Sequence, residues 1–109
     1  MNISALVDII QAAKCTARIK IKGRLDASSW SWIIIPVPSY IELGSVGPWP
    51  VRDVEWVEIN PVTMEHTGRL IPPKRIDNIA QIEEGLRQAN IDYTTLDGIV
   101  HIPLLKAVF

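Results

Sequence analysis

The feature that most constrains the fold is a strict alternation of apolar and basic residues at residues 17–25. The apolar set is Ala17, Ile19, Ile21 and Leu25, and the basic set is Arg18, Lys20, Lys22 and Arg24. Successive side chains of a β-strand point to opposite faces, so this period of two predicts a strand with one buried face. The apolar set is therefore expected in the core and the basic set in water.

The segment IDYTTLDGIVHIP, at residues 91–103, predicts a β-hairpin. Asp97 and Gly98 are typical of a two-residue type I′ turn, in which both central residues need a positive φ. The expected cross-strand pairs are Leu96 with Ile99, Thr95 with Val100, and Thr94 with His101. One face would carry Tyr93, Thr95, Val100 and Ile102, and the other Thr94, Leu96, Ile99 and His101. We expect the face against the second helix to be the more buried one.

Two amphipathic helices are predicted from apolar residues at intervals of three and four. The first stripe is Ile3, Leu6, Val7, Ile10 and Ala13, and the second is Ile76, Ile79, Ile82, Leu86 and Ala89. These stripes predict helices over residues 3–13 and 78–89. Asn78, with Gln81 three residues later, matches a capping box at the start of the second helix.

The middle of the chain predicts further strands separated by turns. Residues 30–35 predict a central strand that ends at the prolines of PVP, with Trp30, Trp32 and Ile34 on one face and Ser31, Ile33 and Ile35 on the other. Residues 44–53 contain two glycines and two prolines around Trp49 and predict a loop. The remaining expectations are a strand over residues 54–59, an irregular segment through Thr67 and a short strand over residues 69–71.

Together these elements predict a single α+β domain over residues 1–109, with two helices and a mixed or mostly antiparallel sheet. A chain of 109 residues can bury a core without a metal or a disulfide. The one cysteine, Cys15, excludes an internal disulfide, and the N-terminal segment lacks the basic residues of a signal peptide. No apolar run is long enough to cross a bilayer. We therefore expect a cytoplasmic protein without a membrane partner.

Motifs of common enzymes are absent: the sequence has no phosphate loop, no dinucleotide fingerprint and no nucleophile elbow. Two histidines and one cysteine at these spacings cannot form a zinc cluster. We therefore expect a protein that is not an enzyme, with no catalytic residue, no metal site and no cofactor.

One alternative is a metal-independent ribonuclease that uses EHTGRLIPPKR, at residues 65–75, for proton transfer and phosphate stabilisation. Its residues would be Glu65, His66, Thr67, Arg69, Lys74 and Arg75, with His101 as a second acid or base. The plainer interpretation is that His66 caps a turn and that the basic residues are solvated, and we favour it because the spacing matches no known motif.

A second hypothesis is single-stranded nucleic-acid binding by the basic set Arg18, Lys20, Lys22 and Arg24. Alternate residues of a strand lie about 6.8 Å apart, which is close to the phosphate repeat of an extended nucleic-acid strand. Two observations weigh against this hypothesis. Residues 17–25 contain no aromatic side chain for base stacking, and the net charge of the chain is −1 rather than clearly positive.

The favoured hypothesis is a domain that binds another protein. Tryptophan and arginine dominate binding hot spots, and Trp49 lies near Arg52 in a segment rich in glycine and proline. Trp49 is expected either as a lid on the core or as an exposed anchor. On a strand, Asp53 and Glu55 would point to the side of Val57, and Glu58 to the other. The predicted partner site is Trp49, Arg52, Asp53, Glu55 and Glu58.

Small cofactor-free domains with segregated charge include bacterial immunity proteins, antitoxins and other inhibitors of a partner enzyme. By elimination, the sequence predicts an inhibitor of this kind that neutralises a toxin. The basic cleft of a nuclease toxin would meet acidic residues, namely Glu42, Asp53, Glu55, Glu58 and Glu65. An acidic partner would meet the basic set instead. The sequence does not choose between these partners and predicts no oligomeric state.

Overall fold

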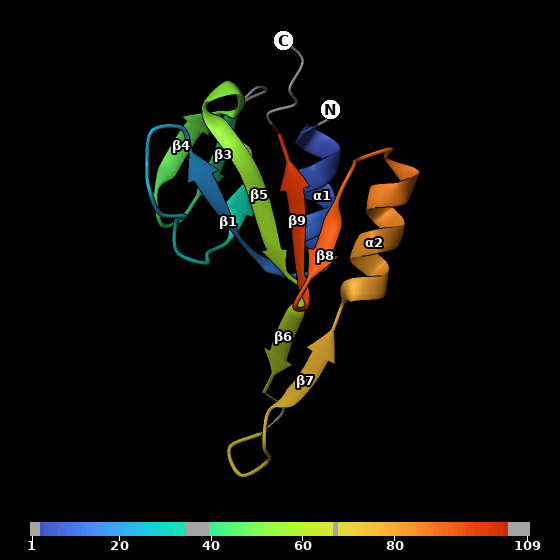
Figure 1. Ribbon diagram of the computed structural model, residues 1–109. Helices are drawn as coiled ribbons and strands as arrows, with labels where there is room; N and C mark the ends of the chain where they lie inside the picture. The colour runs from blue at the N-terminus through green and yellow to red at the C-terminus, as the bar shows by residue number, and fades with distance from the viewer. Residues whose placement is uncertain (1–2, 35–39, 67, 105–109) are drawn as a thin grey trace.

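The computed structural model describes residues 3–34, 40–66 and 68–104 (Figure 1). Its main element is a four-stranded antiparallel sheet in the order β1 (Thr16–Ile21), β5 (Val54–Asn60), β9 (Ile99–Pro103) and β8 (Thr94–Leu96). Helices α1 (Ile3–Ala12) and α2 (Ile79–Gln88) lie on one face of this sheet, which we call the inner face. The fold is α+β, as predicted, and both helices lie within their predicted ranges.

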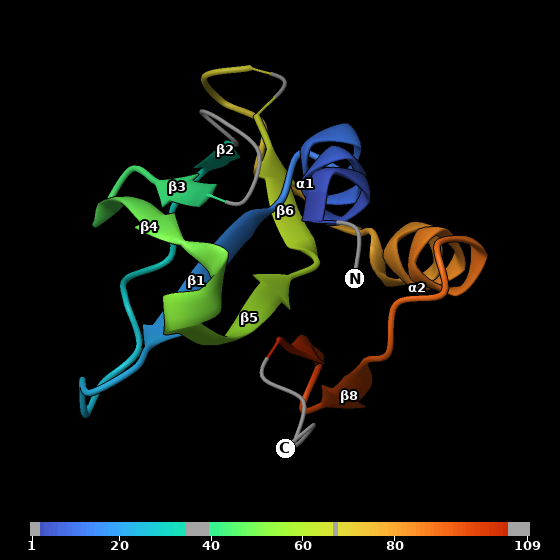
Figure 2. The ribbon, with the colours of Figure 1, turned by 90° about the horizontal axis from the view of Figure 1, so that it is seen from above.

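A second sheet of three strands packs beside α1 and β1 (Figure 2). It contains β2 (Ile33–Ile34), β3 (Tyr40–Leu43) and β4 (Gly47–Pro50), and a short 3₁₀ helix η1 (Val51–Asp53) follows. Gln11 of α1 donates a hydrogen bond from Nε2 to the carbonyl oxygen of Ile33 at 2.9 Å. This contact and the buried side chains of Ile33, Ile41 and Leu43 join the second sheet to the domain.

Two sequence predictions are wrong in this region. The strand expected at residues 30–35 is not central: β2 has two residues and lies at the edge of the three-stranded sheet, and Trp32 is 64% exposed. The loop expected at residues 44–53 contains β4 and η1. The glycine and proline content indicated a loop, but pairing with β3 places Trp49 opposite Ile41 in a strand.

One hydrophobic core fills the space between the inner face, the two helices and the second sheet. The apolar residues of β1 point into it, since Ala17 and Ile19 are fully buried and Ile21 is 3% exposed. The buried face predicted from the alternation is confirmed for these three residues. It is wrong for Leu25, which is 96% exposed. The reason is that β1 ends at Ile21 and the chain turns at Gly23, where φ is 83°.

The hairpin of β8 and β9 has the predicted turn and register. Asp97 and Gly98 have φ values of 53° and 78°, as a type I′ turn requires. The pairs are Leu96 with Ile99, Thr95 with Val100, and Thr94 with His101. Val100 and Ile102 are fully buried, and Thr95 on the same face donates a hydrogen bond to Glu83 of α2 at 3.1 Å. The face towards the helix is therefore the more buried one, as predicted.

The third sheet is a two-stranded antiparallel arm that projects from the body of the domain. It is formed by β6 (Val62–Glu65) and β7 (Lys74–Asp77), and we call residues 62–77 the arm. The projection makes the molecule long, with extents of 53 × 28 × 26 Å. Two predictions are corrected here. Residues expected to be irregular before Thr67 form β6, and the strand expected at 69–71 lies at 74–77 instead.

The start of α2 also differs from the predicted capping box. Asn78 makes no side-chain hydrogen bond to the helix. The carboxylate of Asp77 accepts the N–H of Ile79 at 3.0 Å instead, while Nδ2 of Asn78 donates to the carbonyl oxygen of Pro61 at 3.1 Å. Asn78 therefore holds the two strands of the arm together at its root rather than capping the helix.

Candidate partner-binding surfaces

The outer face of the main sheet, opposite the helices, brings the predicted basic and acidic residues together. Arg18 donates a hydrogen bond from Nε to Oε1 of Glu58 at 2.8 Å, and its Nη2 forms an ion pair with the same oxygen at 2.7 Å. Nδ1 of His101 lies 3.0 Å from the other carboxylate oxygen of Glu58, and Lys20 donates to Glu55 at 2.6 Å. These contacts follow from the register of the sheet, because Arg18 pairs with Glu58 across β1 and β5. Cation and carboxylate on this face therefore neutralise each other.

A β-bulge sets the direction of the acidic side chains. The register between β1 and β5 shifts after Lys20, which pairs with Trp56, whereas Ile21 pairs with Val54. Glu55 is the extra residue in β5, and it binds Lys20 on the outer face beside Glu58. The prediction that Glu55 and Glu58 point to opposite sides is wrong, because it assumed a strand without a bulge.

The four residues of the basic set are not equally exposed. The side chains of Arg18 and Lys20 are only 35% and 18% exposed, whereas Lys22 and Arg24 are exposed. The expectation that all four lie free in water is therefore wrong for the first two, since they pair with carboxylates of the neighbouring strand.

Aromatic rings do lie beside the basic set, although its own segment has none. The guanidinium of Arg18 lies 4.5 Å from the ring centroid of Trp30, and the rings of Trp56 and His101 are 5.2 Å apart. These rings supply stacking surfaces of the kind that nucleic-acid binders use. The paired charges of Arg18 and Lys20 leave this face little positive charge to attract phosphates.

Trp49 is half-buried and packs against the core, as the lid alternative expected. Its Nε1 donates to the carbonyl oxygen of Val46 at 3.2 Å, and the guanidinium of Arg24 lies 5.1 Å from its ring centroid. The backbone N–H of Lys22 donates to the carbonyl oxygen of Asp53 at 2.8 Å. The end of the basic set and the predicted partner site are therefore neighbours on one surface, on which Arg52 is exposed.

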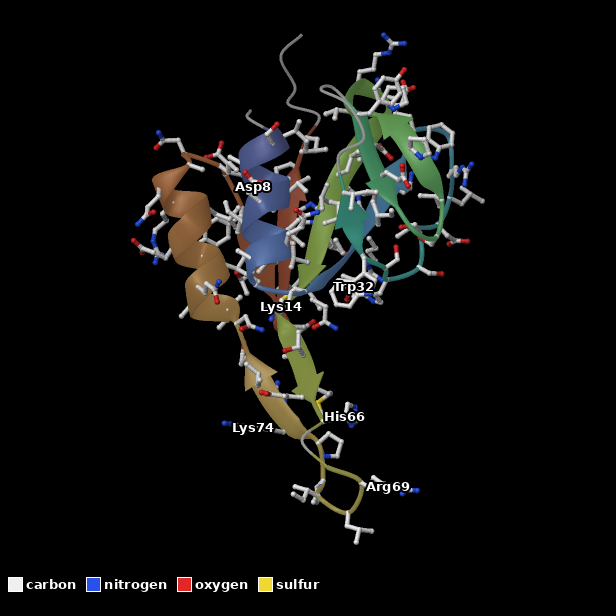
Figure 3. All side chains as sticks on the ribbon, turned by 180° about the vertical axis from the view of Figure 1, so that it is seen from behind. Asp8, Lys14, Trp32, His66, Arg69 and Lys74 are labelled. Carbon is white, nitrogen blue, oxygen red and sulfur yellow. The ribbon has the colours of Figure 1, made fainter. Side chains whose placement is uncertain are left out.

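The residues of the ribonuclease hypothesis are distributed between two separate elements. His66, Arg69 and Lys74 lie on the arm (Figure 3), with Glu65 and Arg75 in its strands. His101 instead lies in β9 and contacts Glu58 and Trp56 of the main sheet. Thr67 lies outside the described residues. Among the residues that the structure describes, no three His, Cys, Asp or Glu side chains gather where a metal ion could bind.

The arm carries apolar side chains that nothing covers. Leu70 is 98% exposed, Ile71 57% and Met64 53%. Sequence reasoning missed this surface because it assigned residues 65–75 to phosphate chemistry or to solvent. The sequence did contain a signal for this surface, namely the pair Leu70-Ile71 followed directly by two prolines. An isolated apolar pair that does not continue a helix or strand period is not expected to reach the core, so it indicates exposed apolar side chains.

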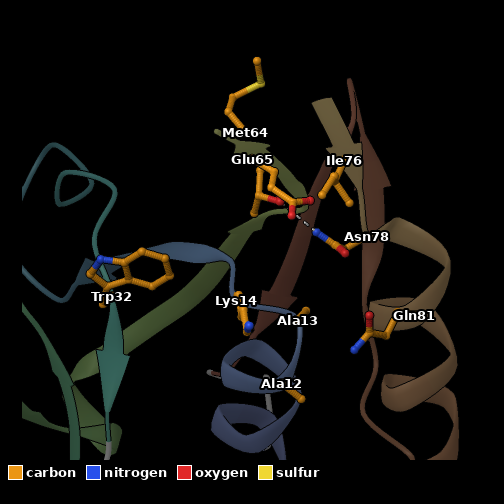
Figure 4. A pocket seen from close by; sticks show the side chains of 10 residues that line it. Ala12, Ala13, Lys14, Trp32, Met64, Glu65, Ile76, Asn78 and Gln81 are labelled. Carbon is orange, nitrogen blue, oxygen red and sulfur yellow. Dashed lines mark hydrogen bonds between the residues drawn. The ribbon is translucent and has the colours of Figure 1, made fainter. Parts of the chain in front are cut away.

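A groove of about 560 Å³ lies at the root of the arm, between the arm, the end of α1 and Trp32 (Figure 4). Met64 and Ile76 line it from the arm, and Trp32 lines it from the opposite side. Lys14, at the end of α1, also lines a neighbouring hollow of about 270 Å³ that shares Trp32. The groove therefore has a mixed lining, since Glu65 and the polar side chains of Thr63, Asn78 and Gln81 line it together with these apolar residues.

The root of the arm is fixed to the core by hydrogen bonds around Cys15. Its buried Sγ lies 3.6 Å from the carbonyl oxygen of Pro61 and 3.7 Å from Nδ2 of Asn78. Asn78 also donates to Oγ1 of Thr63 at 3.4 Å. Burial raises the pKa of the Cys15 thiol, and the hydrogen bond from Asn78 opposes this in part. The thiol is therefore a packed structural group rather than an activated nucleophile.

The geometry defines a small α+β domain that has a charge-paired outer sheet face, a projecting arm with exposed apolar and basic side chains, and a groove at the root of the arm. No helix in the described part of the chain is long and apolar enough to cross a membrane. The chain belongs to DUF6678, a family of unknown function, whose family model matches residues 19–103. The match includes the arm, the whole of α2 and most of the main sheet. No curated protein and no solved structure matches the chain.

Proposed function

We propose that this domain is a non-enzymatic, cytoplasmic binding protein that docks its arm, and the groove at the root of the arm, onto a partner protein. The proposed class is an inhibitor, of the kind represented by immunity proteins and antitoxins. In such proteins a surface, rather than a catalytic group, performs the function.

The observation that carries the proposal is the cluster of exposed apolar side chains on and beside the arm. Leu70, Ile71 and Met64 are each more than half exposed, and so is Trp32 on the far side of the groove. Single exposed apolar residues are common, but several large exposed apolar side chains on and beside one projecting element mark a candidate interaction site. Burying one such side chain in a partner would contribute about 1.5–3 kcal/mol.

The shape of the arm supports an inhibitory mode of binding. A projecting two-stranded element can enter a concave site, and concave sites are where enzymes bind their substrates. The groove at its root would then receive the rim of the partner against Trp32 and Met64. Location in a reducing compartment is supported by Cys15, which is buried and free.

The test is capture of a partner from a lysate of the source organism with wild-type and variant proteins. The arm variant is Leu70→Asp, and its matched control is Leu25→Asp, because these two leucines are 98% and 96% exposed. We expect the arm variant to lower the affinity for the partner at least about tenfold, which equals about 1.4 kcal/mol. The control variant should bind as wild type does, and circular dichroism should show that both variants fold.

Two further variants test whether the partner binds to the surface around Trp49 instead of the arm. These are Trp49→Ala and the double change Asp53→Lys with Glu55→Lys. A partner that is lost from these variants but retained by Leu70→Asp would place the site at Trp49 and would contradict the proposal. If the partner is a toxin, co-expression of wild type should restore growth and Leu70→Asp should not.

A further inference from the structure

The tip of the arm, residues 66–75, combines exposed apolar side chains with a local excess of positive charge, although Glu65 lies opposite Lys74 in the register of the arm. Residues 66–75 contain three basic residues and no acidic residue. These are Arg69, Lys74 and Arg75, and all three are exposed. No carboxylate of the described residues forms an ion pair with any of them, whereas on the body Arg18, Lys20 and Arg87 pair with Glu58, Glu55 and Glu84.

The charge of the chain is therefore separated along its long axis. Residues 66–75 carry +3, and the whole arm, which also contains Glu65 and Asp77, carries +1. Because the whole chain carries −1 with neutral histidines, the rest of the chain carries −2. Such a distribution orients a protein as it approaches a charged surface, and it directs the tip towards negative charge. Leu70 and Ile71 would then meet the partner first.

We propose that the partner site is an apolar pocket with an acidic rim. Leu70 and Ile71 enter the pocket, and the three basic side chains of the tip contact carboxylates of the rim. This inference rests on the proposed function and narrows its partner. A nuclease toxin with a basic cleft would repel the tip, so this chemistry favours an acidic apolar site instead.

Nucleic acid is the competing occupant, because phosphates would attract the same three cations. Two features of the molecule oppose it. The described part of the arm has no Phe, Tyr or Trp side chain on which a base could stack, and offers the imidazole of His66 alone. The body behind the arm is acidic, so DNA bent around an inserted Leu70 would approach negative charge rather than a basic surface.

The inference is tested with the full chain and a library of random short peptides displayed on phage. Peptides that bind wild type are sequenced, and the best are synthesised and measured by fluorescence anisotropy at low and physiological salt. The test variant is Arg69→Glu with Arg75→Glu. Its matched control is Lys22→Glu with Arg87→Glu, since these residues are also exposed but lie outside the arm. A DNA duplex and a single-stranded RNA are measured in parallel.

We expect the selected peptides to combine acidic with aliphatic or aromatic residues, and their binding to weaken as the salt concentration rises. The arm variant should lower their affinity at least about tenfold, while the control variant leaves it unchanged. Peptides that need the arm but carry no acidic residues would overturn this inference and leave the proposed function standing. The absence of any arm-dependent peptide would overturn the inference, while capture of a protein partner still decides the proposed function. Arm-dependent binding of DNA or RNA would overturn both.

Discussion

Replacing Glu58 with alanine should destabilise the domain, because its carboxylate connects three strands. One oxygen accepts a hydrogen bond from Nε of Arg18 in β1 and forms an ion pair with its Nη2, and the other lies 3.0 Å from Nδ1 of His101 in β9. The side chain of Glu58 is only 17% exposed. The substitution would therefore leave a guanidinium and an imidazole without their partner.

The expected loss of stability is smaller than it would be if the Glu58 hydrogen bonds were fully buried. A hydrogen bond to a charged group contributes about 1.5–3 kcal/mol when water is excluded. The side chains of Arg18 and His101 are 35% and 34% exposed, so both regain water when the carboxylate is removed. We therefore expect Glu58→Ala to lower the free energy of unfolding by about 1–3 kcal/mol. This equals a decrease of roughly 1 M in the urea midpoint.

Urea unfolding followed by circular dichroism measures this loss, and Glu84→Ala is the matched control. Glu84 also accepts a hydrogen bond from an arginine, Arg87, but both side chains are 57% exposed. The midpoint of this control should stay close to that of wild type. Equal midpoints for the two variants would refute the reasoning, because burial and the contacts to Arg18 and His101 would then contribute nothing.

Three further predictions concern the turn, the thiol and the basic set. Gly98→Val should destabilise the domain by about 1–3 kcal/mol, because a β-branched residue is strained at a φ of 78°; an unchanged urea midpoint would contradict this. Burial raises the pKa of the Cys15 thiol above its ordinary value of 9.0, so folding favours the neutral thiol. The stability that this group contributes is therefore fully present below pH 9.0 and is lost as the pH rises through the folded-state pKa. Cys15→Ala should abolish that part of the pH dependence, and the native thiol should react with a thiol reagent only after unfolding. Purified protein at micromolar concentration should show no salt-sensitive binding to single-stranded DNA or RNA, and tight binding that Lys22→Ala with Arg24→Ala removes would restore the nucleic-acid hypothesis.

The elements that could be predicted from the sequence are those with local signals. The two helices have apolar stripes within a single segment, and the hairpin has Asp97 and Gly98 between two short strands. Such patterns depend on neighbours a few residues away. In the second sheet and the arm these signals are interrupted by proline and glycine, since β4 is the sequence GPWP and β6 directly follows Pro61. Neither β4 nor β6 was therefore predicted.

For the candidate sites too, local patterns could be predicted from the sequence and long-range contacts could not. The basic and acidic sets were recognised as charged strand faces, but their mutual pairing depends on Arg18 lying opposite Glu58, 40 residues later. The register and the bulge at Glu55 determine that pairing, and the strand patterns alone do not reveal them. The exposure of Leu70 likewise depends on β6 and β7 pairing only with each other.

The claim that the arm is the partner-binding surface is tested most directly by site-specific photocrosslinking in cells of the source organism. A photoreactive amino acid replaces Leu70 in one variant and Leu25 in the other, since both positions are almost fully exposed. We predict a discrete crosslinked protein from position 70, which is absent from position 25 and is lost when Arg69→Glu and Arg75→Glu are added. Equal crosslinking from both positions, or crosslinking from position 25 alone, would contradict the account.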